Sequence, residues 1–257
     1  MKLAYDDAGH GDCVVLIHGH PFDRTLWEPQ AAALRGDFRV VVPDLRGFGQ
    51  SPVTPGLVTM RELAADVEEL LGILGVGRAA AVGLSMGGLV TMELAAAQPE
   101  RYWAIGLVAT TMEPPAPPER TSRRERADAV ERDGMQVLVD YMQTGVYGPH
   151  CPASVRERVD VMMSAALPAG AAAALRGRAE RPDYRPLLAK LDIPALVCAG
   201  SADPWSNQAV TAEIVANLKR PELLVIDSVG HLPNLEAADE FNDTLGAFLQ
   251  AHAPGPA

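Results

Sequence analysis

The sequence G-L-S-M-G at 83–87 places Ser85 between two glycines at the spacing G-x-S-x-G. A short apolar run at 79–82 precedes it, and helix-forming residues at 88–97 follow it. A strand that passes into a helix through so tight a turn holds the central residue in a strained backbone conformation and exposes its side chain. Because three fixed residues also occur together by chance, this interpretation depends on partner residues elsewhere in the chain. Ser85 is the candidate nucleophile.

A serine hydroxyl is a weak nucleophile at neutral pH and needs a neighbouring base, which a carboxylate in turn orients. His231 is the predicted base, because it follows the apolar run 223–226 and precedes a helical stretch. Asp203 is the predicted acid, because it follows the apolar run 195–199 in a loop that contains glycine and proline. Taken alone, Asp203 is equally well explained as a turn residue, and Glu113 is the alternative acid.

Stabilisation of a tetrahedral intermediate requires two backbone N–H groups that point at its oxygen. The first is predicted at Met86, the residue after the nucleophile. The second is predicted in the loop 18–21, which follows the apolar run 14–17. Pro21 has no N–H, so His20 is the predicted donor. The sequence leaves open whether the His20 side chain contacts substrate or solvent.

The predicted substrate pocket is apolar and draws residues from several parts of the chain. Its predicted lining residues are Phe22, Trp205, Met135, Met142 and Met162. For any single methionine at helical spacing, plain helix packing is the favoured alternative. The basic cluster between Arg120 and Arg126 is interpreted as a solvated helix face rather than an anion site.

Short apolar runs alternate with amphipathic stretches, which is typical of a mostly parallel sheet covered by helices. Strands are predicted at 14–17, 39–42, 79–82, 105–109, 195–199 and 223–226. Helices are predicted at 59–74, 89–98, 207–217 and 237–251, the first opened by a capping box at Thr59 and Glu62.

Residues 113–193 break this alternation, because they contain helical patterns and no strand signal. They open with the proline-rich stretch 114–118, which is predicted to act as a stiff hinge. We therefore expect an α/β core domain of residues 1–112 and 194–257, with an all-helical cap inserted at 113–193.

Composition and charge limit the classes of function. The 257 residues suffice for one large core. The formal net charge of −11 argues against nucleic-acid and anionic-membrane partners, and slightly against electrostatic steering of strongly anionic substrates. The N-terminus lacks an apolar signal-like run, and no stretch is long enough to span a membrane. We expect a soluble, cytoplasmic protein that acts on a small molecule; its oligomeric state is not defined by the sequence.

The pair His18 and His20 raises the question of a zinc site, because neighbouring histidines can chelate that metal. The H-x-H-x-D-H pattern of metallo-hydrolases requires other residues at 22 and 23, where this chain has Phe22 and Asp23. Neither a metal nor any other cofactor is predicted.

Several motifs, in this order along the chain, resemble the α/β-hydrolase fold family. They are His18-Gly19-x-Pro21, Pro43-Asp44-x-Arg46-Gly47, Gly83-Leu84-Ser85-Met86-Gly87-Gly88, Asp203 after a strand, and Gly230-His231-x-Pro233-x-x-Glu236. Within the family the chain is most similar to small cap-bearing esterases, 3-oxoadipate enol-lactonases and cofactor-free perhydrolases. The resemblance implies a mostly parallel, eight-stranded sheet flanked by helices, with its first strand at 2–5 and the cap after the sixth strand. It also implies a triad in the order Ser, Asp, His.

Together these residues predict a serine hydrolase that cleaves a small carboxylic ester or lactone through an acyl-enzyme on Ser85. An acyltransferase or a cofactor-free perhydrolase would use the same acyl-enzyme and is the alternative. A non-catalytic ligand-binding protein on this fold is disfavoured, because Ser85, Asp203 and His231 are all present.

Overall fold

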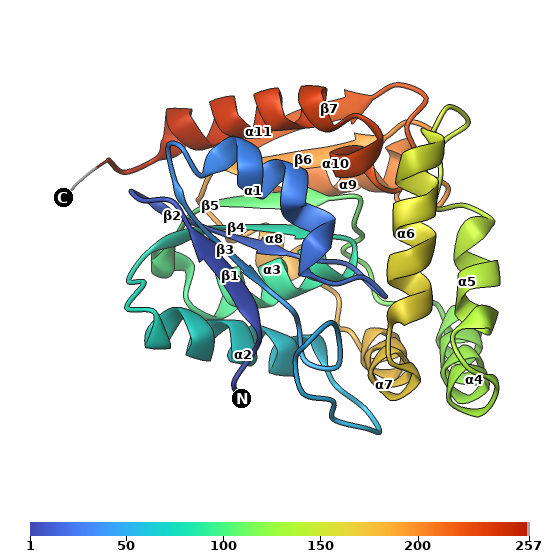
Figure 1. The fold of residues 1–257 in the computed structure, drawn as a ribbon. Helices are drawn as coiled ribbons and strands as arrows, with labels where there is room; N and C mark the ends of the chain where they lie inside the picture. The colour runs from blue at the N-terminus through green and yellow to red at the C-terminus, as the bar shows by residue number, and fades with distance from the viewer. Residues whose placement is uncertain (256–257) are drawn as a thin grey trace.

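Seven strands form one sheet with the order β1-β3-β2-β4-β5-β6-β7 in the computed structural model, which describes residues 1–255 (Figure 1). Their bounds are β1 Tyr5–Ala8, β2 Cys13–Ile17, β3 Arg39–Pro43, β4 Ala79–Leu84, β5 Tyr102–Val108, β6 Ala195–Gly200 and β7 Pro221–Ile226. β1 pairs with β3 in the antiparallel sense, and the other pairings are parallel. The mostly parallel sheet is confirmed. The expected count of eight strands is wrong for the described residues.

The eighth strand was implied by the resemblance without a residue range of its own. The first strand was expected at 2–5 and is shifted along the chain, since β1 begins at Tyr5. The residues before β1 pack against a loop instead of pairing in the sheet. The Leu3 side chain is buried, and the Ala4 N–H donates a hydrogen bond to Ser51 Oγ at 2.9 Å. With one strand fewer, the helical insertion follows the fifth strand and not the sixth.

The four strands β2, β4, β5 and β6 are buried along their whole length. Nearly continuous apolar residues are typical of parallel strands whose two faces are both covered. The edge strand β7 is partly exposed. Each of the six strands predicted from an apolar run is present at its place. In all of them except β7, burial on both faces explains the clear signal in the sequence.

Helices cover both faces of the sheet (Figure 1). α1 (Glu28–Leu34) and α11 (Ala238–His252) pack together on one face, and α2 (Met60–Ile73) and α3 (Met86–Ala97) on the other. The capping box at the start of α2 is confirmed: Thr59 Oγ1 accepts from the Glu62 N–H at 3.2 Å, and the Glu62 carboxylate accepts from the Thr59 N–H at 2.8 Å. The remaining core helices are α9 (Gln208–Asn217) and α10 (Pro233–Glu236), with short 3-10 turns at Arg24–Trp27 and Pro99–Arg101.

Five helices lie between β5 and β6. The four longer ones stand beyond the carboxyl ends of the parallel strands, whereas α8 packs against α3 and α9 (Figure 1). They are α4 Pro117–Asp133, α5 Gln136–Gln143, α6 Ala153–Ala165, α7 Pro168–Ala179 and α8 Arg185–Leu188. The all-helical character of the insertion is confirmed. The proline-rich stretch 114–118 is partly helical, since α4 already begins at Pro117, and its action as a hinge stays a prediction. Proline is tolerated in the first helical turn, where an N–H has no partner within the helix.

Helix α7 is fixed to the core through two glycines. A Cβ at Gly170 would fall 1.9 Å from the Gly47 carbonyl oxygen, and one at Gly177 would fall 1.7 Å from the Val58 carbonyl oxygen. The Val58 N–H also donates to the Ala173 carbonyl at 3.1 Å. Backbone therefore packs directly against backbone at this junction. Among the described residues no single helix is long and apolar enough to cross a membrane; α6 and α7 pass that test only as a pair, bent by 95°.

Candidate active site

Ser85 occupies the turn between β4 and α3, with φ 55° and ψ −109°. A positive φ is strained for a residue other than glycine. A Cβ at Gly83 would fall 2.1 Å from the Gly87 carbonyl oxygen, and one at Gly87 would fall 2.1 Å from the Ile17 carbonyl oxygen. Both glycines of the motif are therefore required by close backbone approach, and the strained turn predicted from G-x-S-x-G is present.

The backbone of Ser85 is held on both sides by neighbouring groups. Its N–H donates to the Val108 carbonyl at 2.8 Å, and its carbonyl accepts from the Thr110 hydroxyl at 2.8 Å. The side chain stands at the N-terminus of α3, where N–H groups without helical partners favour negative charge. Ser85 thus lines a cavity from a fixed position.

His231 and Asp203 are brought together although they come from the loops after β7 and β6. His231 Nδ1 donates to Asp203 Oδ2 at 2.7 Å, and both side chains are buried. Asp203 also accepts hydrogen bonds from the Trp205 N–H at 2.8 Å and from the Ser206 hydroxyl. Burial raises the pKa of Asp203, but attraction to His231 and these hydrogen bonds outweigh it and lower the pKa below its usual value. The carboxylate is therefore kept ionised beside the imidazole.

Ser85 and His231 line the same cavity. In the described part of the chain, Ser85 Oγ makes no direct hydrogen bond to the His231 imidazole. Catalytic hydrogen bonds are often long or poorly aligned before substrate binds. Trp205 lies edge-on to His231, with ring centroids 4.9 Å apart. The His231 N–H donates to the Val146 carbonyl at 3.0 Å, so the insertion also positions this loop. The alternative acid, Glu113, faces the cavity too but pairs with Arg185 at 3.1 Å.

The two predicted oxyanion donors lie at the same end of the sheet. Met86 is the first residue of α3, so its N–H has no partner within the helix. His20 lies in the loop after β2 and lines the cavity with Ser85. Its side chain is 2% exposed, so the alternative of a solvated His20 is wrong. Burial and the positive charge of Arg178 lower the pKa of His20 well below its usual value, which keeps the imidazole neutral.

The cavity has a volume of about 400 Å³. Of the five residues predicted to line it, Trp205 and Met142 do so, whereas Phe22, Met135 and Met162 are not among its lining residues. Phe22 and Met135 are buried in the hydrophobic core instead, and Met162 borders a separate surface hollow beside Thr25 and Arg158. Methionines at helical spacing pack between helices as readily as they line a cavity, and sequence spacing does not distinguish the two.

The lining is much more charged than the predicted apolar pocket. It includes four arginines, Arg123, Arg126, Arg178 and Arg181, and two glutamates, Glu113 and Glu119. The interpretation of the 120–126 cluster as a solvated face is therefore wrong for two of its members. Arg123 and Arg126 are three residues apart and so share one side of α4, but this spacing does not reveal whether that side faces solvent or the cavity.

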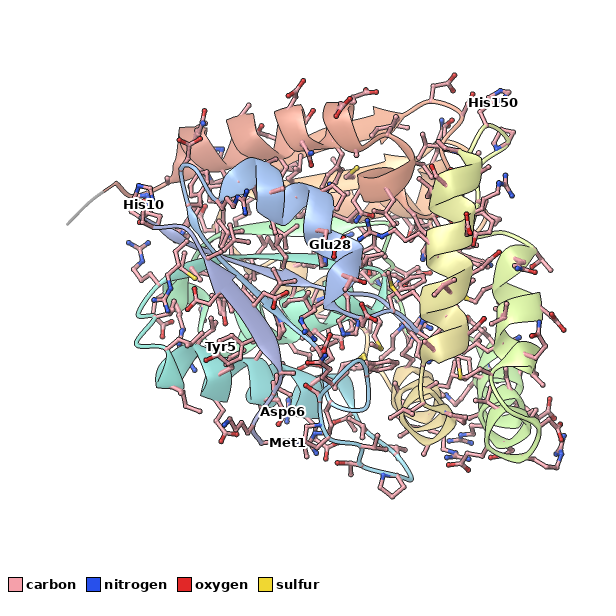
Figure 2. The ribbon with its side chains drawn as sticks, in the orientation of Figure 1. Met1, Tyr5, His10, Glu28, Asp66 and His150 are labelled. Carbon is pink, nitrogen blue, oxygen red and sulfur yellow. The ribbon has the colours of Figure 1, made fainter. Side chains whose placement is uncertain are left out.

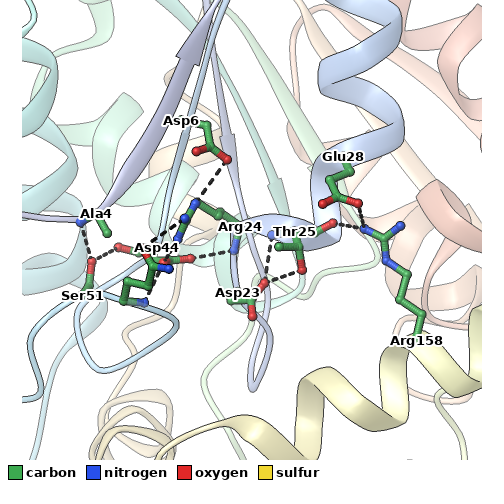
Figure 3. A network of polar contacts seen from close by, with 10 residues as sticks. Ala4, Asp6, Asp23, Arg24, Thr25, Glu28, Asp44, Ser51 and Arg158 are labelled. Carbon is green, nitrogen blue, oxygen red and sulfur yellow. Dashed lines mark hydrogen bonds and ion pairs between the residues drawn. The ribbon is translucent and has the colours of Figure 1, made fainter.

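Other polar residues near these loops stabilise the fold. Asp44 accepts hydrogen bonds from the Arg24 N–H and the Gln50 N–H, each at 2.8 Å, and pairs with the Arg24 guanidinium (Figure 3). Both ring nitrogens of His18 are engaged: Nδ1 donates to the Gly19 carbonyl at 2.8 Å, and Nε2 accepts from the Leu45 N–H at 2.9 Å. These contacts join the loops after β2 and β3.

Two further histidines lie far from this region. Figure 2 shows His10 at the end of the sheet opposite the insertion and His150 at the outer edge of the insertion, where both are exposed. Neither is among the residues that line the cavity with Ser85. His20 and His231 are the two histidines of that lining.

The chain matches the model of the alpha/beta hydrolase family over residues 14–244, and it belongs to that family. Its curated relatives include 3-oxoadipate enol-lactonase 1 of Acinetobacter baylyi, which is 30% identical over 98% of this chain and 93% of its own length. The enzyme class predicted from the motifs, a hydrolase of esters or lactones, is confirmed.

Solved structures agree with this placement. A thermophilic esterase from Thermogutta terrifontis, determined with malate bound, is 36% identical, has a TM-score of 0.93, and covers 98% of this chain and 94% of its own. The enol-lactonase of Burkholderia xenovorans LB400 is 28% identical, with a TM-score of 0.87 and coverage of 96% of both chains.

Proposed function

We propose that the protein hydrolyses a small carboxylic ester or lactone through an acyl-enzyme on Ser85. The observation that carries this proposal is the 2.7 Å contact of His231 Nδ1 with Asp203 Oδ2, at a cavity that Ser85 also lines. Because Nδ1 holds its proton toward Asp203, Nε2 is the basic nitrogen and is available to the serine hydroxyl.

In the proposed reaction, Ser85 Oγ attacks the ester carbonyl while His231 Nε2 takes the hydroxyl proton. The N–H groups of Met86 and His20 stabilise the oxyanion of the tetrahedral intermediate. His231 then returns the proton to the leaving alkoxide, which departs as an alcohol. Water then attacks the acyl carbonyl while His231 Nε2 takes a proton from it. The bond to Ser85 Oγ breaks, His231 returns the proton to Ser85 Oγ, and the carboxylic acid leaves. Asp203 orients His231 and stabilises its positively charged form.

The helical insertion, residues 113–193, is proposed to act as a cap over the reacting groups. Its contribution to the cavity lining, which includes Leu138, Tyr141 and Met142, supports this role. Excluding bulk water strengthens the interaction of the N–H donors with the developing oxyanion. For a lactone the same steps apply, and the leaving alkoxide stays tethered to the acyl group.

Labelling with a fluorophosphonate probe, together with hydrolysis of p-nitrophenyl butyrate, tests this function. Wild type should be labelled once and should turn over the ester, whereas Ser85→Ala should do neither while remaining folded. Ser164→Ala, an exposed serine on α6, is the matched control and should behave as wild type. Full labelling of Ser85→Ala would show that another residue is the nucleophile.

A further inference from the structure

Arginines from two helices of the insertion meet at the cavity that holds Ser85. Arg123 and Arg126 come from α4, Arg178 comes from α7, and Arg181 follows α7. Only two glutamates share the lining with these four arginines, so the charged groups of the cavity carry an excess of positive charge. This local charge is opposite in sign to the net charge of −11 of the whole chain. The negative charges that produce the net charge lie elsewhere, and solvent screens their effect on the cavity.

Two of these arginines have partners in the protein. Arg123 Nε pairs with Glu119 at 3.0 Å along α4. Arg181 donates to the carbonyl of Glu113 at 2.8 Å and to the carbonyl of Arg178 at 3.1 Å. Arg181 thus ties the segment after α7 to the start of the insertion. These two side chains are accounted for by the fold.

Arg178 and Arg126, in contrast, have no carboxylate partner in the described residues. Among residues 1–255 Arg178 makes no side-chain hydrogen bond and no ion pair, and its Nε is enclosed without a partner. Arg126 lies over the Tyr141 ring at 3.5 Å and has no carboxylate partner in the described residues. Both side chains therefore retain hydrogen-bond donors that face the cavity.

Arg178 is half-buried, with its Nε fully enclosed, and a guanidinium that loses part of its hydration without gaining a counter-ion is unfavourable for folding. Burial and the neighbouring charges of Arg123 and Arg181 lower the pKa of the Arg178 guanidinium. The nearby carboxylate of Glu119 is already paired with Arg123. Burial raises the pKa of Glu119, but the charges of Arg123, Arg181 and Arg178 outweigh burial and lower it. The surroundings of Arg178 thus lack one negative charge.

We propose that the substrate carries a carboxylate in addition to its ester group, and that Arg178 and Arg126 bind this carboxylate inside the cavity. A planar guanidinium donates two parallel hydrogen bonds to a carboxylate, so the anion would be oriented as well as attracted. In a cavity of about 400 Å³ the substrate class is the half-ester of a short dicarboxylic acid. This inference rests on the proposed function, since the ester carbonyl must reach Ser85.

Paired substrates test the proposal kinetically. Monomethyl glutarate and methyl pentanoate have similar length and differ by one charge. Wild type should show a kcat/KM at least about tenfold higher for the half-ester, the size expected of one charge-assisted hydrogen-bonded contact. In Arg178→Met this preference should fall to about twofold or less, and Arg126→Gln should reduce it in part.

The matched control is Arg176→Gln. Arg176 lies two residues before Arg178 on α7, but it pairs with Asp128 and Glu131 at 2.7 Å and is not among the residues that line the cavity. Its variant should keep the wild-type preference for the half-ester. Equal losses of kcat/KM for both substrates in Arg178→Met, with the preference intact, would overturn the proposal.

Binding without turnover separates this inference from the proposed function. Glutarate should bind Ser85→Ala protein in a calorimetric titration and raise its melting temperature, and both effects should disappear when Arg178→Met is added. If glutarate binds but no ester is hydrolysed, the anion site stands and the proposed function fails. If esters are hydrolysed in a Ser85-dependent way but glutarate does not bind, the function stands and the anion site fails.

Discussion

His20 donates a hydrogen bond from Nε2 to the backbone carbonyl oxygen of Ala171, across 2.9 Å. A carbonyl oxygen only accepts, so Nε2 carries the ring proton and Nδ1 is left as an unprotonated acceptor. Ala171 belongs to α7, and His20 belongs to the loop after β2. The helical insertion and the core are therefore joined at the residue proposed to stabilise the oxyanion.

Gly170→Ala is expected to disturb this junction. The new Cβ would fall 1.9 Å from the Gly47 carbonyl oxygen, so α7 would have to move and carry Ala171 away from His20. We expect a loss of about 1–3 kcal/mol in the free energy of unfolding, as for other overpacked sites, and a lower kcat. Urea unfolding and p-nitrophenyl butyrate hydrolysis measure the two effects.

Gly72→Ala is the control for that substitution. Gly72 lies in α2, and a Cβ there would meet no atom within 4 Å. Alanine in an open helical position should stabilise the protein by about 0.5–1 kcal/mol and leave activity unchanged. Equal stability of the two variants would show that α7 does not depend on the contact with Gly47.

Asp203→Asn should preserve the shape of the loop but lose the negative charge that orients His231. An amide can donate to Nδ1 and so favour the unproductive tautomer, with a decrease in kcat of roughly three to four orders of magnitude. Steady-state kinetics on p-nitrophenyl butyrate measure this decrease. Activity within about threefold of wild type would assign the acid role to Glu113, which also faces the cavity.

The same carboxylate should make stability depend on pH. The pKa of Asp203 is lowered in the folded protein, so its ionised form stabilises the fold above the usual pKa of about 3.9. That contribution is lost as the pH falls through the lowered value. The difference in free energy of unfolding between wild type and Asp203→Asn should therefore be largest above about pH 4 and shrink below it. A constant difference in urea unfolding from pH 3 to pH 6 would contradict this.

The sequence predicted the parts of the fold that rest on local signals. Apolar runs identified six strands, namely five buried ones and the edge strand β7. The capping box at Thr59 identified the start of α2. The eighth strand came from the resemblance alone and is absent from the described residues. α1 was not predicted, because its seven residues are too few for a clear helical period.

The candidate site was predicted as far as its residues follow strand ends. Ser85, Asp203, His231 and His20 meet because the carboxyl ends of parallel strands lie at one edge of a sheet. The cavity lining was predicted poorly, since it depends on which side of α4 and α7 faces inward. Arg178 shows this: nothing in its sequence neighbourhood separates it from the surface residue Arg176.

Activity should be insensitive to chelators. In the proposed mechanism backbone N–H groups stabilise the oxyanion, and no Lewis acid is needed. Both ring nitrogens of His18 are already hydrogen-bonded, so a metal at His18 and His20 would have to displace these contacts. Hydrolysis of p-nitrophenyl butyrate after EDTA treatment and dialysis should equal that of untreated protein. A loss of activity restored by zinc or manganese would revive the metal site.

Acyl-chain length should be limited by the cavity, because its volume of about 400 Å³ is near the lower end of the range for ligand pockets. Among p-nitrophenyl esters, those with acyl chains of roughly two to six carbons should have a much higher kcat/KM than the twelve-carbon ester. Leu138→Ala, which shortens a lining side chain on α5, should move the optimum to longer chains. Leu167→Ala, at an exposed position, is the matched control and should leave the optimum in place. A wild-type preference for twelve carbons would show that the insertion leaves the cleft open.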